Sequence, residues 1–63
     1  MTKSKITLDD LTDDEAWALA QMTKRMIWDD FHRLSSGRAE RDDMGSATIK
    51  LRRALAEAGF DPR

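Results

Sequence analysis

LTDDEAWALAQMTKRMIWDDFHRLSSG, residues 11–37, contains the clearest helix signals of the chain. It opens with TDDE, in which Thr12 is a suitable N-cap and Glu15 follows three residues later. This spacing is typical of a capping box, where each side chain bonds the other residue's backbone N–H. Acidic residues in the first turn also complement the helix dipole, and Gly37 is a suitable helix stop. We therefore expect one continuous helix over residues 12–35.

A second helix is expected over residues 38–58. Gly59 stands where a left-handed glycine commonly ends a helix, and Pro62 cannot continue one. One stripe of this helix is apolar or small at the helical period, and consists of Met44, Ala47, Thr48, Leu51, Ala54, Leu55 and Ala58. Gly45 disfavours the helix interior by up to about 1 kcal/mol relative to alanine. A break within DDMGS, residues 42–46, is therefore the alternative.

The first predicted helix has an unusually wide apolar arc. Trp17 and Trp28 are eleven residues apart in the sequence and would lie within about 20° of each other around a straight helix. One partner helix cannot cover such an arc, so we expect a partner or dimer interface formed by Trp17, Met22, Met26, Trp28 and Phe31. The alternative for the two tryptophans is a place in the protein's own core.

These elements predict an all-α fold: a two-helix hairpin preceded by a short extended and flexible segment, residues 1–11. A chain of 63 residues makes one domain, residues 1–63, and buries only about 60% of its unfolded surface. Small domains are commonly stabilised by disulfides, metals or association. With no cysteine and one histidine, association is the remaining device, and we expect a homodimer in which two hairpins form a four-helix bundle.

Composition and motifs also limit the classes of function that this chain can have. No nucleophile stands beside a base in the sequence, so we expect no enzyme activity and no cofactor. The net charge of −1 does not favour nucleic acid as a partner, although it leaves room for local basic patches. No apolar run is long enough for a signal peptide or a membrane span, so we expect a cytoplasmic protein without a membrane partner.

The segment DDLTDDE, residues 9–15, contains five carboxylates. Asp13, Asp14 and Glu15 are explained by helix capping and the helix dipole, whereas Asp9 and Asp10 precede the cap. Their spacing does not match an EF-hand calcium loop. Two interpretations remain for Asp9, Asp10, Asp13 and Asp14: a solvated helix start, or a docking surface for a basic protein.

Two stretches, LTDDEAWALAQMTKR at residues 11–25 and ALAEAGFDPR at residues 54–63, resemble the two ends of a family of short uncharacterised proteins. That family is encoded by bacteriophages and integrated mobile elements, mainly in proteobacteria. The resemblance implies a protein that binds and blocks a host protein, as anti-CRISPR proteins do, with a Cas effector subunit as the target. In that role the acidic side chains would imitate phosphates in a basic nucleic-acid channel. The resemblance implies no catalytic residues.

The alternative function is a dimeric DNA-binding regulator that resembles the ribbon-helix-helix class. The segment KSKITL, residues 3–8, alternates polar and apolar side chains as a short strand does. Paired strands from two chains would then enter the major groove, with Lys3, Lys5 and Thr7 facing the bases. The long first helix and the lack of excess basic charge argue against this alternative.

Overall fold

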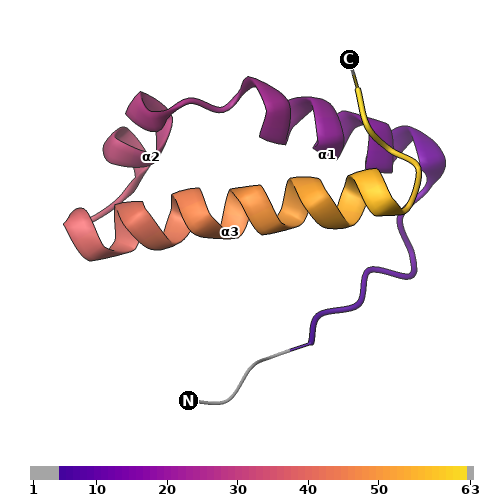
Figure 1. Ribbon diagram of the computed structural model, residues 1–63, viewed down its shortest axis with the longest axis horizontal. Helices are drawn as coiled ribbons and strands as arrows, with labels where there is room; N and C mark the ends of the chain where they lie inside the picture. Colours follow the sequence, from indigo (N-terminus) through magenta and orange to yellow (C-terminus); the bar gives the residue numbers. More distant parts are fainter. Residues whose placement is uncertain (1–4, 63) are drawn as a thin grey trace.

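The computed structural model describes residues 5–62 and contains three helices (Figure 1). They are α1 (Asp13–Arg25), α2 (Trp28–Leu34) and α3 (Arg38–Glu57). α3 runs the length of the molecule, and α1 and α2 pack against it from the same side, α2 over its N-terminal part (Figure 1). No strand occurs in the described residues. The all-α class is confirmed, but the predicted two-helix hairpin is wrong.

The predicted helix over residues 12–35 is broken at Met26 and Ile27, which separate α1 from α2. Both residues are extended, with φ −69° and ψ 133° at Met26 and φ −119° and ψ 171° at Ile27. Asp30 stabilises the restart, because its carboxylate accepts a hydrogen bond from the Ile27 N–H at 2.9 Å. α2 therefore begins with its own cap, and a bundle of two uninterrupted hairpins no longer describes the molecule.

The charge pattern carries a signal of this break that the apolar periodicity concealed. Lys24 and Arg25 lie in the last turn of α1, and Asp29 and Asp30 lie in the first turn of α2. Cations favour the C-terminal end of a helix dipole and anions the N-terminal end. The sequence KRMIWDD, residues 24–30, therefore has the charge order of one helix ending and another beginning.

The outer ends of the fold follow the predicted capping. The Thr12 N–H donates to Glu15 at 2.9 Å and the Glu15 N–H donates to Thr12 Oγ1 at 3.1 Å, so the capping box is confirmed. At the other end Gly59 has φ +100°, while the Phe60 N–H bonds the Leu55 carbonyl and the Gly59 N–H bonds that of Ala56. These two bonds form a Schellman motif, which turns Phe60 back toward α1.

The described interior is small. Its buried apolar side chains are Ala16, Ala20, Phe31 and Leu55. Thr23 is also buried, and its hydroxyl donates to the Ala20 carbonyl at 2.9 Å, which removes the cost of an unpaired polar group. α3 continues through Gly45, so the alternative break within residues 42–46 does not occur.

Residues 5–10 leave the helices and run along the outside of the molecule below α3 (Figure 1). All six are exposed, and Ile6 keeps 82% of its surface accessible. Within the described range, no helix combines the length and the apolar character needed to cross a bilayer.

Candidate functional site

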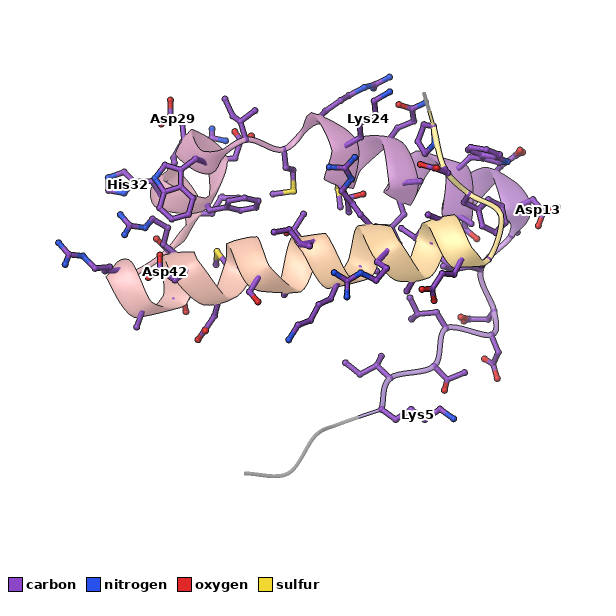
Figure 2. The ribbon with its side chains drawn as sticks, in the orientation of Figure 1. Lys5, Asp13, Lys24, Asp29, His32 and Asp42 are labelled. Carbon is purple, nitrogen blue, oxygen red and sulfur yellow. The ribbon has the colours of Figure 1, made fainter. Side chains whose placement is uncertain are left out.

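The acidic side chains of residues 9–15 lie on the surface at the start of α1. Asp9, Asp10, Asp13 and Asp14 are all exposed, and none of them forms a salt bridge with a described basic side chain. Asp13 lies at the outer end of α1 in Figure 2. These four carboxylates are therefore available to a basic partner.

Glu15 differs from its acidic neighbours because it is committed to the helix start. Hydrogen bonds from the backbone and then from the side chain of Thr12 lower the pKa of the Glu15 carboxyl below its usual value. The charged form is the one that these donors stabilise. Glu15 therefore belongs to the cap, and Asp13 and Asp14 complement the helix dipole in the first turn of α1. Asp9 and Asp10 are the carboxylates of this cluster that folding leaves unexplained.

The two tryptophans do not lie on one line of one helix, because the break places them on α1 and α2. The Trp17 ring meets the Phe60 ring edge-on, with centroids 5.4 Å apart and planes at 80°. The Trp28 ring carries the Arg41 guanidinium 4.5 Å above its centroid, a cation–π contact between α2 and α3. Each tryptophan thus binds its own chain on one side and remains about half exposed on the other.

The other three predicted interface residues have different environments. Phe31 is buried, with 8% of its surface accessible, and so contributes to the core of the monomer. Met22 is exposed at 52%, whereas Met26 is half-buried. Of the predicted set, Met22 presents the most accessible apolar side chain on α1.

An open groove of about 450 Å³ follows the outer side of α1 and α2 where the chain breaks. Its lining consists of Ala18, Met22, Arg25, Met26, Asp30, Arg33 and Leu34. Arg33 pairs with Asp30 at 3.0 Å along the groove, and Leu34 keeps 59% of its surface exposed. Ala18, Arg25 and Leu34 were not among the predicted interface residues. The sequence does contain a signal for Ala18 and Arg25, because they recur at helical spacing with Asp14 and Met22.

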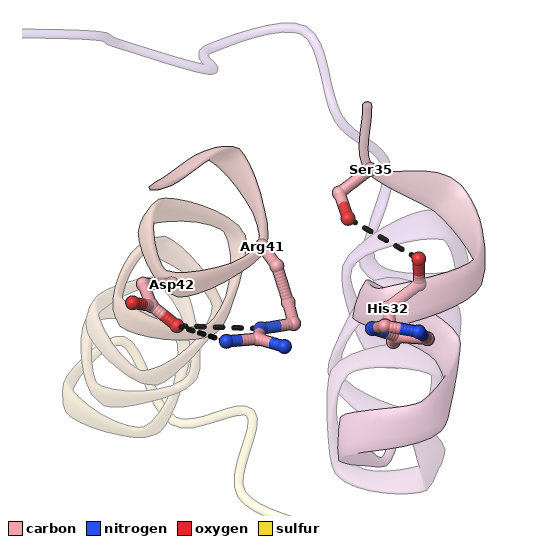
Figure 3. A network of polar contacts seen from close by, with 4 residues as sticks. All are labelled: His32, Ser35, Arg41 and Asp42. Carbon is pink, nitrogen blue, oxygen red and sulfur yellow. Dashed lines mark hydrogen bonds and ion pairs between the residues drawn. The ribbon is translucent and has the colours of Figure 1, made fainter. Parts of the chain in front are cut away.

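The corner between α2 and α3 holds a polar cluster (Figure 3). Ser35 Oγ donates to the His32 carbonyl at 3.2 Å, and Arg41 pairs with Asp42 at 3.4 Å. The Ser36 N–H donates to Glu40 at 2.8 Å. These bonds satisfy backbone groups at the end of α2 and orient Arg41 over Trp28, so they position the corner.

The described residues contain no group of three or more histidine, cysteine or acidic side chains that could hold a metal ion. Lys5 and Thr7, two of the residues predicted to face DNA bases, are exposed in an extended segment that forms no strand within residues 5–62. Lys3 lies outside the described residues. The DNA-binding alternative therefore stays a prediction to which the described geometry adds no support.

A comparison with models of known protein families identifies the family of this chain. A model described as a family of unknown function (DUF7706) matches residues 1–63. The chain belongs to this family. No curated protein and no solved structure matches it. Membership of DUF7706 confirms the resemblance to a family of unknown function and assigns no activity.

Proposed function

We propose that this DUF7706 protein acts without catalysis, by binding another protein. The observation that carries the proposal is the contrast between its interior and its surface. Within residues 5–62 the buried apolar set contains two alanines and only two large side chains, whereas large apolar residues are exposed on every element. They are Ile6, Leu8, Trp17, Met22, Ile27, Trp28, Leu34 and Ile49. Met22 and Leu34 line one groove, and Ile6 and Leu8 line another, so several of these residues lie together. Contiguous exposed apolar groups are characteristic of protein-binding surfaces.

The specific form of the proposal is an anti-CRISPR inhibitor of phage or mobile-element origin that binds a Cas effector subunit. Its support is the resemblance of residues 11–25 and 54–63 to a family of short uncharacterised phage and mobile-element proteins, together with the exposed aspartates of residues 9–14. In this proposal Asp9, Asp10, Asp13 and Asp14 dock on the basic channel that normally receives nucleic acid. Long-range attraction would raise the association rate and make it depend on salt.

The test is binding of the full chain to purified CRISPR effector complexes, with and without nuclease treatment. The variant Asp9→Asn/Asp10→Asn removes two carboxylates from the proposed surface. The matched control, Asp29→Asn/Asp43→Asn, removes two exposed carboxylates from α2 and α3. We expect the first variant alone to associate more slowly at low salt, and we expect guide RNA or target DNA to compete with the wild-type protein.

The specific proposal fails if no effector component binds the wild-type chain at micromolar concentration. Binding that disappears on nuclease treatment also contradicts it, because the contact would then run through nucleic acid. Equal association rates for the two double variants would show that the acidic segment is not the docking surface.

A further inference from the structure

The outer face of α1 carries an ordered stripe of four exposed residues. Asp14, Ala18, Met22 and Arg25 follow one another at intervals of four, four and three residues, so they lie along one side of the helix. The buried residues Ala16, Ala20 and Thr23 lie on the opposite side, against α3. The stripe therefore faces away from the rest of the chain.

The chemical order of this stripe makes it complementary to itself. It begins with an acid at the N-terminal end of α1, continues with one small and one long apolar residue, and finishes with a base. If a second α1 runs antiparallel beside the first, the acid of each meets the base of the other, and the long side chain of each meets the small one. A two-fold axis between the helices produces both sets of contacts at once.

We propose that a second copy of this chain occupies this face, with the two α1 helices antiparallel. In this dimer Asp14 of each copy pairs with Arg25 of the other, and Met22 of each copy packs over Ala18 of the other. Neither Asp14 nor Arg25 has a salt-bridge partner among the described residues of its own chain. Antiparallel packing also places opposite ends of the two helix dipoles side by side.

The groove beside the stripe supplies room for the partner's apolar side chains. Ala18, Met22 and Arg25 form part of its lining, and it continues past the break to Leu34 on α2. Methionine fills irregular gaps well because its side chain is unbranched and flexible. The contact would cover Met22 and Leu34, which are among the most exposed large apolar residues of the helices.

A second copy is favoured over a foreign protein because the acidic and basic ends of the stripe complement each other across a two-fold axis. A foreign partner would need a complementary stripe of its own. The inference does not depend on the proposed CRISPR partner, since it concerns association of the chain with itself. The dimer contact takes up Asp14, one of the four aspartates of the proposed acidic docking surface. Asp9, Asp10 and Asp13 lie outside the pairing and remain available to a basic partner.

The test is the mass of the purified full chain by sedimentation equilibrium over a range of concentrations. We expect a dimer for the wild-type protein. Asp14→Arg alone and Arg25→Asp alone each place like charges opposite one another, and each should weaken dimerisation by on the order of tenfold or more. An equimolar mixture of the two variants should recover the dimer, because each heterodimer contains two opposite-charge pairs.

Matched controls are Asp43→Arg and Arg53→Asp, which reverse exposed charges on α3 and should leave the dimer unchanged. Circular dichroism of every variant separates loss of association from loss of folding. A wild-type chain that stays monomeric at millimolar concentration overturns the inference and leaves the face to a foreign protein. Single variants that dimerise as well as wild type, or a mixture that does not recover the dimer, overturn the proposed register.

Discussion

The two ends of α3 are held by different kinds of contact. At its C-terminal end α1 approaches through the small residues Ala16, Ala20 and Thr23, and the Phe60 ring leans edge-on against Trp17. At its N-terminal end the short helix α2 depends on one buried ring, Phe31, beside Gly45, and on the stacking of Arg41 over Trp28. The first end is held by small buried side chains and one edge-on aromatic contact, whereas the second end is held by one buried ring and one cation–π contact.

This difference predicts where the fold breaks most easily. Phe31→Ala removes the only described large buried side chain of α2 and should lower the free energy of unfolding by about 3–5 kcal/mol. Chemical denaturation measures the loss, and backbone NMR should show that α2 is affected first. Ile49→Ala on α3 is the control, because Ile49 is exposed and lies outside the proposed dimer contact. An equal loss for the two variants would contradict the packing described here.

The α1 end can be weakened through backbone strain. Gly59 has φ +100°, a left-handed conformation that costs an L-residue about 1–2 kcal/mol. We expect Gly59→Ala to lower the free energy of unfolding by about that amount and to loosen the Phe60–Trp17 contact. Gly59→Asn should cost less, because asparagine tolerates this conformation better. Thermal unfolding followed by tryptophan fluorescence checks both, and identical midpoints for Gly59→Ala and wild type would contradict it.

At the α2 end, a substitution of Gly45 by alanine should raise the free energy of unfolding, whereas the substitutions at Phe31 and Gly59 lower it. A methyl group there would lie 3.7 Å from the Trp28 ring and 3.8 Å from the Phe31 ring, at ordinary van der Waals distance. Gly45→Ala should therefore raise the free energy of unfolding by about 0.5–1 kcal/mol through helix propensity. Denaturant titration measures this gain. Gly45→Leu is the contrasting variant, because its larger side chain should displace the rings and lower stability.

The smallest expected effect is a pH dependence at the start of α1. Thr12 lowers the pKa of Glu15, so the folded chain binds the Glu15 proton more weakly than the unfolded chain. This contribution is present above the usual glutamate pKa and is lost as pH falls through the lowered value. Glu15→Gln should remove this part of the pH dependence, and an NMR titration of the carboxyl checks the direction. A Glu15 pKa at or above its usual value would contradict the capping geometry.

Sequence reasoning succeeded where the controlling contacts are local. The capping box joins Thr12 to Glu15 over three residues, and the Schellman turn at Gly59 spans five. It failed at Met26 and Ile27, where neither residue is a helix breaker and the apolar spacing continues across the break. For the candidate site, the sequence indicates the aspartates and Met22, which the structure exposes, and Phe31, which the structure buries. It does not indicate Arg25 by itself, because a single exposed charge on a helix is distinguished only by its helical spacing with Asp14 and Met22. The binding role of these residues stays a prediction.

Local sequence patterns specify the helical class, the outer ends of the helices and the charge of the N-terminal surface, because helix propensity and capping depend on residues within about one turn. The charge order of residues 24–30 signals the break in the first helix, whereas long-range packing decides which face of each tryptophan is covered and which residues line the groove. Those outcomes depend on contacts such as Trp17 with Phe60 and Phe31 with Gly45. Such partners are distant in sequence, and no local pattern specifies that they meet.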